Sequence, residues 1–479
     1  MGIVYVSPEK MWDTWIYQAG NEFHLFFLSE GNIGRAVSAD LIHWNHLPPI
    51  KNMAVVGDWD ETGMRMTGSV AKVGESYYLC YGSRGEGTPI GLIRSEDLVT
   101  WTRVGDHPIL PSKTPYDAGN SWRDLTAYLD EEAGVWNGYL YAIHGETGKP
   151  AIAHIRSKDY FTWSYHEPIY MSEETYSRTN NGFVDLEVPD YFEMEGTRYM
   201  LFSSCQSRKH STSGRTDAMG TWYIRADVGN ESWELPAAPL LLGSGQGRFD
   251  NYVGRTVMFR GQRLLYHHTW GEGKVSWATP KLITQDANDN LVLRYWPDLD
   301  RLITGAATVN RNFSVHAASN ETACELIDTT VEDFMLTCTA DVSHANSATL
   351  LWHVQPVRHS HRAGSTIVAS GLHIDPKQNT ISLMEVRYLE QSIRRFNGNT
   401  YPRYLRDNYA FGTLNCGKLQ IRIISRAHQV EIYINDVWVF SMDMSDLPLS
   451  GQFGILCDSG QTHLSEVVIS ELEPLAREY

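Results

Sequence analysis

The stretch Ser38–Trp44, with the sequence SADLIHW, decides the fold because it returns along the chain. It recurs as SEDLVTW at Ser95–Trp101 and as SKDYFTW at Ser157–Trp163, and a weaker copy ends in Asp227 and Trp233. The aspartates of successive copies lie 57, 62 and 68 residues apart. Such an interval indicates a repeated supersecondary structure. We expect each aspartate to bind backbone amides in a tight turn, and each tryptophan to pack between neighbouring repeats.

An aromatic, strand-like run precedes each copy, and one further run follows the last copy. A spacing of roughly sixty residues suits a four-stranded antiparallel blade with its turns. The sequence therefore predicts an all-β fold whose first part is a five-bladed β-propeller. The five runs are residues 23–28, 77–81, 139–143, 199–202 and 264–268.

The pattern changes at about residue 305, where the repeat stops. Short alternating strands follow, separated by turn residues such as Asn435-Asp436. This pattern is typical of an antiparallel β-sandwich. We therefore predict a propeller domain over residues 1–300 and a β-sandwich domain over residues 301–479.

Composition and charge exclude several classes of partner. The chain has 479 residues and a formal net charge of -17, so it repels phosphate backbones and anionic lipid. We expect no nucleic-acid partner and no membrane partner, and both a monomer and a homo-oligomer stay open. The N-terminus lacks the features of a signal peptide. This favours a cytoplasmic protein, or a secreted one if a signal has already been removed.

The cysteines do not form a metal-binding pattern. All six are scattered singly, without a Cys-x-x-Cys pair, so zinc binding and a disulfide framework are poorly supported. We expect no metal and no cofactor.

Acidic residues fall at comparable places in three of the repeats. Asp13, Asp124 and Glu187 each precede the aromatic run of their repeat by ten to fifteen residues. In a propeller the innermost strands converge on the central channel, where ligands bind. Like charges raise each other's pKa, so such a cluster is costly unless it is used. Glycoside hydrolysis uses one protonated and one ionised carboxyl group. We therefore predict that these three residues are catalytic.

At these residues the chain resembles glycoside hydrolase family 32, the family of invertases, inulinases and levanases. Arg123-Asp124-Leu125 is similar to its Arg-Asp-Pro motif, and Glu187-Val188-Pro189-Asp190 to its Glu-Cys-Pro-Asp motif. Gly68-Ser69 matches its Gly-Ser pair in blade two, and Asp250-Asn251-Tyr252 looks like its Asp-x-Tyr element. The resemblance implies a five-bladed propeller followed by a β-sandwich.

The resemblance also implies a reaction and the residues that perform it. Asp13 would be the nucleophile, Asp124 would stabilise the oxocarbenium-like transition state, and Glu187 would be the acid/base of a retaining reaction. The expected activity is that of an exo-acting β-fructofuranosidase, with sucrose or an inulin- or levan-type fructan as the carbohydrate substrate. The expected substrate contacts are Trp12, Thr67, Ser69, Arg123, Asp250 and Tyr252.

The first motif departs from the family. Its Asn-Asp-Pro-Asn-Gly sequence is reduced to Trp12 and Asp13, and Leu28 replaces the Gln that ends the next strand. Met66 and Thr67 stand where a Trp precedes the Gly-Ser pair, and Val188 replaces the Cys. A site that hydrogen-bonds sugar hydroxyls discriminates strongly, so these changes affect which sugar is held. Another furanoside therefore stays open as the substrate.

Two other functions remain open from the sequence. An inverting enzyme like those of glycoside hydrolase family 43, acting on arabinose or xylose residues, would use Asp13 as a general base, with Asp124 tuning the pKa of Glu187. A separation of the Asp13 and Glu187 carboxyl groups of about 5 Å would favour retention, and one of about 6.5–9.5 Å would favour inversion. The altered first motif also allows a non-catalytic carbohydrate-binding protein.

Overall fold

The protein is described from a computed structural model, in which the chain divides into two compact parts. We call Val4–Leu293 the N-terminal unit, and the part that begins at Arg294 the C-terminal unit. Among the described residues, no helix is long and apolar enough to cross a membrane. The described residues are 4–84, 88–116, 121–173, 182–204, 219–244, 251–271, 274–358, 365–389, 403–404, 409–410, 418–427, 429–443 and 448–475.

The N-terminal unit contains four separate four-stranded antiparallel sheets, which we call blades one to four. Each blade is built from strands in chain order, so that hairpins connect all neighbours. Blade one contains β1 (Trp12–Ala19), β2 (Glu22–Ser29), β3 (Asn32–Ser38) and β4 (Asn45–Ile50), and blade two contains β5 (Met66–Val73), β6 (Ser76–Gly82), β7 (Ile90–Ser95) and β8 (Thr102–Arg103). Blade three contains β9 (Arg123–Asp130), β10 (Val135–Ile143), β11 (Pro150–Ser157) and β12 (Trp163–Met171), and blade four contains β13 (Glu187–Met194), β14 (Thr197–Ser204), β15 (Met219–Asp227) and β16 (Leu240–Ser244).

The fifth repeat does not form a separate four-stranded sheet, which differs from the prediction of five equal blades. Its strands are β17 (Asn251–Phe259), β18 (Gln262–Gly271), β19 (Lys274–Trp277), β20 (Lys281–Gln285) and β21 (Leu291–Arg294). They pair in the order β17-β18-β20-β21, and β19 is a second partner of β18. The third strand is thus broken into β19 and β20, and Pro280, which has no amide hydrogen to donate to a sheet, lies at the break.

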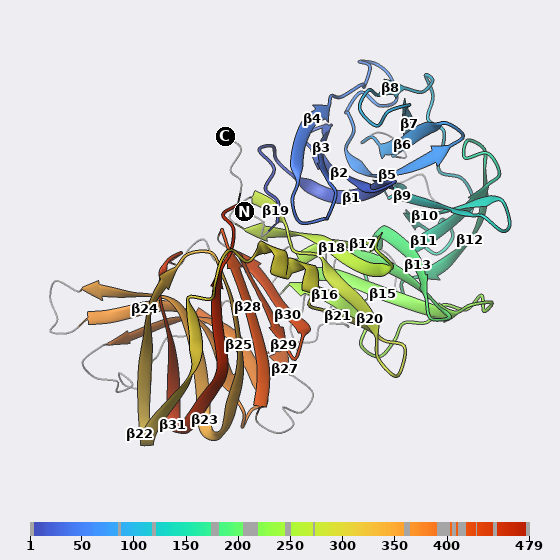
Figure 1. Cartoon of the computed structure of the whole chain (residues 1–479). Coiled ribbons are helices and arrows are strands. Elements are labelled where there is room, and N and C mark those ends of the chain that lie inside the picture. The colour runs from blue at the N-terminus through green and yellow to red at the C-terminus, as the bar shows by residue number, and fades with distance from the viewer. Residues whose placement is uncertain are drawn as a thin grey trace. The chain divides into compact units, whose positions relative to one another are not determined.

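The first strand of every repeat lies beside the first strand of the next. Strand β1 contacts β5, β5 contacts β9, β9 contacts β13, β13 contacts β17, and β17 contacts β1 again (Figure 1). These five inner strands therefore close a ring, and the blades of a β-propeller extend outward from it. This ring positions the site.

The hydrophobic core of the N-terminal unit lies between neighbouring blades. Trp101 belongs to a cluster shared by blades one and two, and Trp163 to a cluster shared by blades two and three. The aspartates of the three clear copies behave as predicted, for example Asp97, whose Oδ1 accepts the amides of Val99 at 2.8 Å and Thr100 at 2.7 Å. The repeated motif is therefore scaffold, since its aspartate closes the turn and its tryptophan fills the space between blades.

In its described residues the C-terminal unit is antiparallel and all-β apart from a short 3-10 helix at Pro297–Leu302. Two long strands, β22 and β23, both pair with the long strand β31, and the core contains buried Val, Leu, Ile and Phe side chains. Its strands are β22 (Val309–Val331), β23 (Phe334–Arg358), β24 (Ser365–Asp375), β25 (Thr380–Leu389), β26 (Arg403–Tyr404), β27 (Tyr409–Ala410), β28 (Lys418–Arg426), β29 (Gln429–Ile434), β30 (Val437–Asp443) and β31 (Gly451–Glu471).

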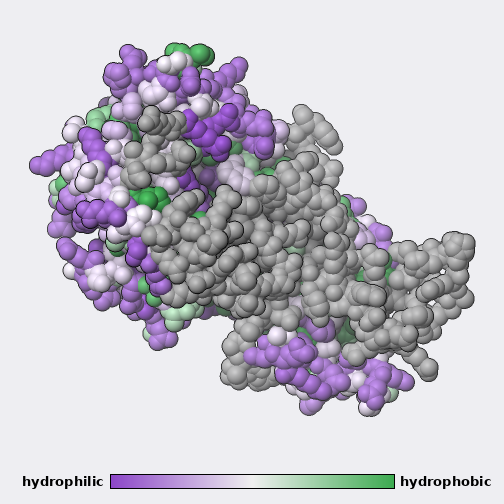
Figure 2. All heavy atoms as spheres, turned by 180° about the vertical axis from the view of Figure 1, so that it is seen from behind, coloured by the Kyte–Doolittle hydropathy of each residue, from purple (hydrophilic) through white to green (hydrophobic). Residues whose placement is uncertain are grey.

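The described surface is mainly hydrophilic on the face seen in Figure 2, where hydrophobic side chains are scattered. Among the described residues, the large exposed apolar side chains include Val56 and Val99, which come from different parts of the chain. Single exposed apolar residues are normal for a globular protein.

The turn aspartate of blade one allows a test of this scaffold. Asp40 Oδ1 accepts hydrogen bonds from the amides of Ile42 and His43. Its Oδ2 lies 2.8 Å from Nδ1 of the His43 ring. We expect Asp40→Ala to lower the free energy of unfolding by about 1–2 kcal/mol, because it leaves these amides without an acceptor. Asp40→Asn keeps an acceptor oxygen and should cost less. Thermal unfolding of both variants checks this, and equal losses would contradict the role of the side-chain oxygen.

Candidate active site

Each inner strand departs from regular pairing at one place, and the predicted site residues lie at these places. A β-bulge puts an extra residue into one strand and turns side chains to new directions, and bulges are common next to active sites. The irregular positions are Trp12–Thr14 in β1, Met66–Ser69 in β5, Arg123–Thr126 in β9, Glu187–Asp190 in β13 and Tyr252–Arg255 in β17.

Three of these bulges hold a non-glycine residue in the left-handed region. The φ angles are 64° at Asp124, 50° at Val188 and 52° at Val253. Left-handed backbone is strongly disfavoured for β-branched residues, so the surrounding structure must impose it. Val188 and Val253 are fully buried and pack with Tyr252. In β5 the bulge contains Gly68, where an added Cβ would lie 2.2 Å from the carbonyl oxygen of Cys80.

Only one carboxylate oxygen of Asp13 is hydrogen-bonded in the described part of the chain. Its Oδ2 accepts a very short hydrogen bond from the hydroxyl of Thr67 on blade two, whereas its buried Oδ1 has no hydrogen-bond partner among the described residues. Burial raises the pKa of Asp13 to about 7; the nearby Glu187 raises it as well, while Thr67 and Arg123 lower it. The effect of Glu187 on the pKa of Asp13 indicates that the inner strands of blades one and four place these two carboxylates near each other.

Asp124 is buried beside the same charges. Its Oδ2 accepts the Val188 amide at 3.3 Å and lies 3.6 Å from Nε of Arg123. Burial raises its pKa to about 7, and Glu187 and Asp13 add to this rise while Arg123 opposes it. All three predicted carboxylates therefore influence one another, as the repeat pattern predicts.

Both oxygens of Glu187 are engaged. Nη2 of Arg123 lies 2.5 Å from Oε1, and the Tyr252 hydroxyl donates a very short hydrogen bond to Oε2. The guanidinium of Arg123 also lies 4.5 Å from the ring centroid of Tyr141, which supports it from one face. Arg123 thus binds two of the three acids, and Tyr252 joins the fifth repeat to the third acid. Tyr141 was not foreseen from the sequence.

A second arginine links the inner strands close to the acids. Nη1 of Arg255 donates to the Gly68 carbonyl at 3.1 Å, and Nη2 donates to the Thr126 hydroxyl at 2.8 Å. Its Nε lies 3.6 Å from Oδ1 of Asp190, and Asp190 also accepts the amide and hydroxyl of Thr256. One buried side chain therefore joins the strands that carry Thr67, Asp124 and Glu187. Nothing in the repeat pattern distinguishes Arg255 as such a link.

Trp12 lies next to a buried histidine. The rings of Trp12 and His268 are 5.3 Å apart, and His268 is 6.0 Å from the ring of Tyr252. Burial lowers the pKa of His268 to about 3, so the imidazole is neutral, and neither ring nitrogen has a hydrogen-bond partner in the described part of the chain. The side chain of Trp12, the residue before Asp13, therefore packs against the fifth repeat.

Two of the predicted substrate contacts, Ser69 and Asp250, differ from the others. The Ser69 hydroxyl donates to the Leu125 carbonyl at 2.7 Å and so bridges blades two and three. This contact occupies its only hydrogen, and a role in substrate binding stays a prediction. Asp250 lies outside the described residues, so its predicted role cannot be placed.

Comparisons with known proteins agree with the fold. Residues 13–249 match the family model described as the glycosyl hydrolases family 32 N-terminal domain. A levanase of Bacillus sp. (strain L7) is 33% identical in a 137-residue alignment that covers 24% of this chain and 14% of the levanase. The chain thus matches only a small part of the length of that relative.

Solved structures match over nearly the whole chain. A β-fructofuranosidase of Aspergillus kawachii has a TM-score of 0.70 at 14% identity, covering 100% of this chain and 95% of that one. The Bombyx mori GH32 β-fructofuranosidase BmSUC1 has a TM-score of 0.67 at 16% identity, with 98% and 92% covered. The exo-inulinase of Aspergillus awamori has a TM-score of 0.66 at 15% identity, with 99% and 98% covered. At such identities these likenesses concern the fold.

The fold and the family match together define a propeller-type glycosyl hydrolase domain. Residues 13–249 thus belong to glycoside hydrolase family 32 as its N-terminal domain.

The raised pKa of Asp13 predicts a pH-dependent effect on stability. An aspartate of the unfolded chain titrates near 3.8, whereas Asp13 in the folded protein titrates at about 7. The folded state therefore holds this proton more tightly, and the contribution of Asp13 to stability falls as the pH rises from about 4 to about 7. We expect Asp13→Asn to raise the melting temperature by about 3 °C or more at pH 8 and to have little effect near pH 4.

The exposed Glu75 serves as a control for this measurement, because Glu75→Gln removes a charge without relieving burial. Thermal melts across this pH range compare the two variants with the unaltered protein. An equal shift in both variants, or an Asp13→Asn effect independent of pH, would refute the assignment.

Proposed function

We propose that this protein is a retaining, exo-acting glycosidase of β-fructofuranosides such as sucrose or fructans. The observation that carries the proposal is the meeting of Asp13, Asp124 and Glu187 at the bulges of three inner strands, joined by Arg123. A retaining glycosidase needs a nucleophilic carboxylate and an acid/base carboxyl group on either side of one glycosidic bond. The family match supports the same residues.

In the first step Asp13 attacks the anomeric carbon while Glu187 gives a proton to the leaving oxygen. Oδ1 of Asp13 is the attacking atom, because Thr67 occupies Oδ2 and leaves Oδ1 without a partner. A covalent glycosyl-enzyme ester forms and the glycosidic bond breaks. In the second step Glu187 takes a proton from water, the water oxygen attacks the anomeric carbon, and Asp13 leaves as a carboxylate.

The remaining residues hold the reacting groups and the charge. Asp124 accepts hydrogen bonds from sugar hydroxyls and stabilises the positive charge that develops on the ring. Arg123 and Tyr252 both donate to Glu187, so one of these donors must give way when the glycosidic oxygen reaches Glu187. Arg123 also lowers the pKa of Asp13, which helps the nucleophile to ionise.

Trp12 affects which sugar the proposed site would bind. An indole at this position can contact a sugar ring through its face, but it accepts no hydrogen bonds from hydroxyls. Several structural neighbours act on fructosides, and a variant of the Bombyx mori enzyme is known in complex with sucrose. β-Fructofuranosides are therefore the first substrates to test, and other furanosides follow.

The proposal includes the architecture inferred from the repeat. We take β17–β21 as the fifth blade of a five-bladed propeller over residues 1–300, and residues 301–479 as a β-sandwich. The ring of five inner strands and the antiparallel strands of the C-terminal unit support this division.

The deciding experiment incubates the protein with sucrose, inulin and levan and measures released fructose. Proton NMR of the first product gives its anomeric configuration, which separates retention from inversion. Turnover of another furanoside alone would refute fructose as the sugar, and inverted product would refute the assigned mechanism. Tight binding of a fructoside without turnover would instead support a carbohydrate-binding protein.

Glu187→Gln tests the acid/base assignment. The amide keeps the shape of the side chain but cannot transfer the proton, so we expect kcat to fall by about 10³-fold on an unactivated substrate. Glu193→Gln is the matched control, because Glu193 lies on the same strand β13 with its carboxylate bound to Tyr191. Steady-state kinetics of both variants check this, and full activity in Glu187→Gln would contradict the mechanism.

A further inference from the structure

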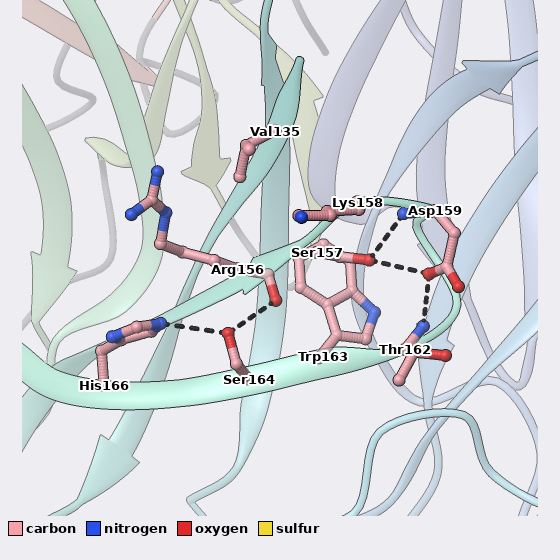
Figure 3. A pocket seen from close by; sticks show the side chains of 9 residues that line it. All are labelled: Val135, Arg156, Ser157, Lys158, Asp159, Thr162, Trp163, Ser164 and His166. Atoms are coloured by element: carbon pink, nitrogen blue, oxygen red, sulfur yellow. Dashed lines mark hydrogen bonds between the residues drawn. The ribbon is translucent and has the colours of Figure 1, made fainter. Parts of the chain in front are cut away.

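The outer strands of blade three enclose a pocket that the proposed reaction does not use. It has a volume of about 500 Å³ and lies at the turn between β11 and β12 (Figure 3). A volume of this size suits a small molecule such as one or two sugar rings. Its lining includes Arg156, Lys158 and His166, so its polar groups are mainly basic in a chain with a net charge of -17.

The same turn in blade two shows what is unusual here. Arg94 and Arg156 occupy equivalent places, each one residue before the serine of the repeat motif. Each pairs with the first hydroxyl residue of the next strand, Thr102 in blade two and Ser164 in blade three. The two blades therefore provide a matched comparison within one chain.

The comparison shows a reversal of charge. In blade two Arg94 binds Glu96 at 2.9 Å and the Ser76 hydroxyl at 3.0 Å. In blade three the residue equivalent to Glu96 is Lys158. Arg156 thus loses the acidic neighbour that Arg94 has, and its buried Nε has no hydrogen-bond partner in the described chain. Neither Arg156 nor Lys158 has a carboxylate within ion-pairing distance among the described residues.

The single acidic residue of the pocket lining does not replace the missing partner. Oδ1 of Asp159 accepts the Ser157 hydroxyl at 2.9 Å and the amides of Phe161 at 2.8 Å and Thr162 at 2.7 Å. Its charge is therefore already engaged in closing the turn, as Asp97 is in blade two.

The floor of the pocket is rigid. Trp163 is 9% exposed and belongs to the core between blades two and three. The Ser164 hydroxyl lies 3.1 Å from the Arg156 carbonyl and 3.0 Å from Nε2 of His166, which fixes the far side (Figure 3). The basic side chains thus extend from a backbone that strand pairing and these hydrogen bonds hold in place.

We propose that this pocket binds a small sugar that carries an oxyanion, either a phosphate or a carboxylate. The two cations would each donate a charge-assisted hydrogen bond to the oxyanion, as Arg94 does to the carboxylate of Glu96 in blade two. Sugar hydroxyls would meet the polar groups around Ser164 and His166. This inference does not depend on the reaction proposed for the central site.

The test measures binding by isothermal titration calorimetry at low ionic strength, because salt screens charges in an open pocket. The probes are glucose 6-phosphate, glucuronate, inorganic phosphate and uncharged glucose. We expect saturable binding of one equivalent of glucose 6-phosphate or glucuronate, and none of glucose. Binding of inorganic phosphate with equal affinity would overturn the sugar part of the proposal, and failure of both anionic sugars to bind would overturn all of it.

Lys158→Glu restores the charge pattern of blade two and should pair with Arg156. We expect it to weaken binding of the anionic sugar by about tenfold or more, since one charge-assisted contact is lost and a repulsive charge is added. Lys72→Glu makes the same change of net charge on an exposed part of blade two and should leave affinity unchanged. Unaltered binding in Lys158→Glu, or equal losses in both variants, would overturn the site.

Discussion

The guanidinium of Arg255 is the contact on which the geometry of the central site depends. It comes from the fifth repeat and reaches the Gly68 carbonyl, the Thr126 hydroxyl and the carboxylate of Asp190 on three other repeats. A planar group with five donors can hold several strands at fixed spacings, whereas a lysine would offer one point charge. Each bonded residue lies within three positions of Thr67, Asp124 or Glu187 along its own strand. The spacing of the inner strands therefore also sets the spacing of the acids.

The buried acids in turn lower the stability of the folded protein, and the rest of the site offsets this loss only in part. Burial raises the pKa of both Asp13 and Asp124 to about 7, and Arg123 is the nearby charge that opposes the rise. One cation among three carboxylates leaves an excess of negative charge as the pH rises. Such arrangements persist where function requires them, because they do not stabilise the fold. The left-handed φ of Asp124 adds backbone strain at the same place.

The sequence was sufficient for features that repeat and insufficient for features that depend on register. The Asp-x-x-x-Trp motif predicted the turns and the packing of Trp101 and Trp163, and the common offset of the acids predicted their convergence. Most of the bulges could not be foreseen: Gly68 is the kind of residue that marks one in β5, whereas Val188 and Val253 disfavour the backbone they adopt. The sequence did not predict the break in the third strand at Pro280. The length of the repeat does not show that β18 pairs with β19 along one half and with β20 along the other.

The repeat also gives room in one chain for the two sites proposed above. Residues that close the turn or fill the space between blades, such as Asp159 and Trp163, are fixed by the scaffold in each repeat where they occur. The position between the serine and the aspartate of the motif is exposed and varies, since Glu96 in blade two corresponds to Lys158 in blade three. At the inner strands the same freedom operates at the bulges, where Asp13, Thr67, Asp124 and Glu187 occupy related places. The strands and turns of a blade thus stay the same, while residues on its inner strand and at its outer turn vary. Each of these two places can bind its own ligand.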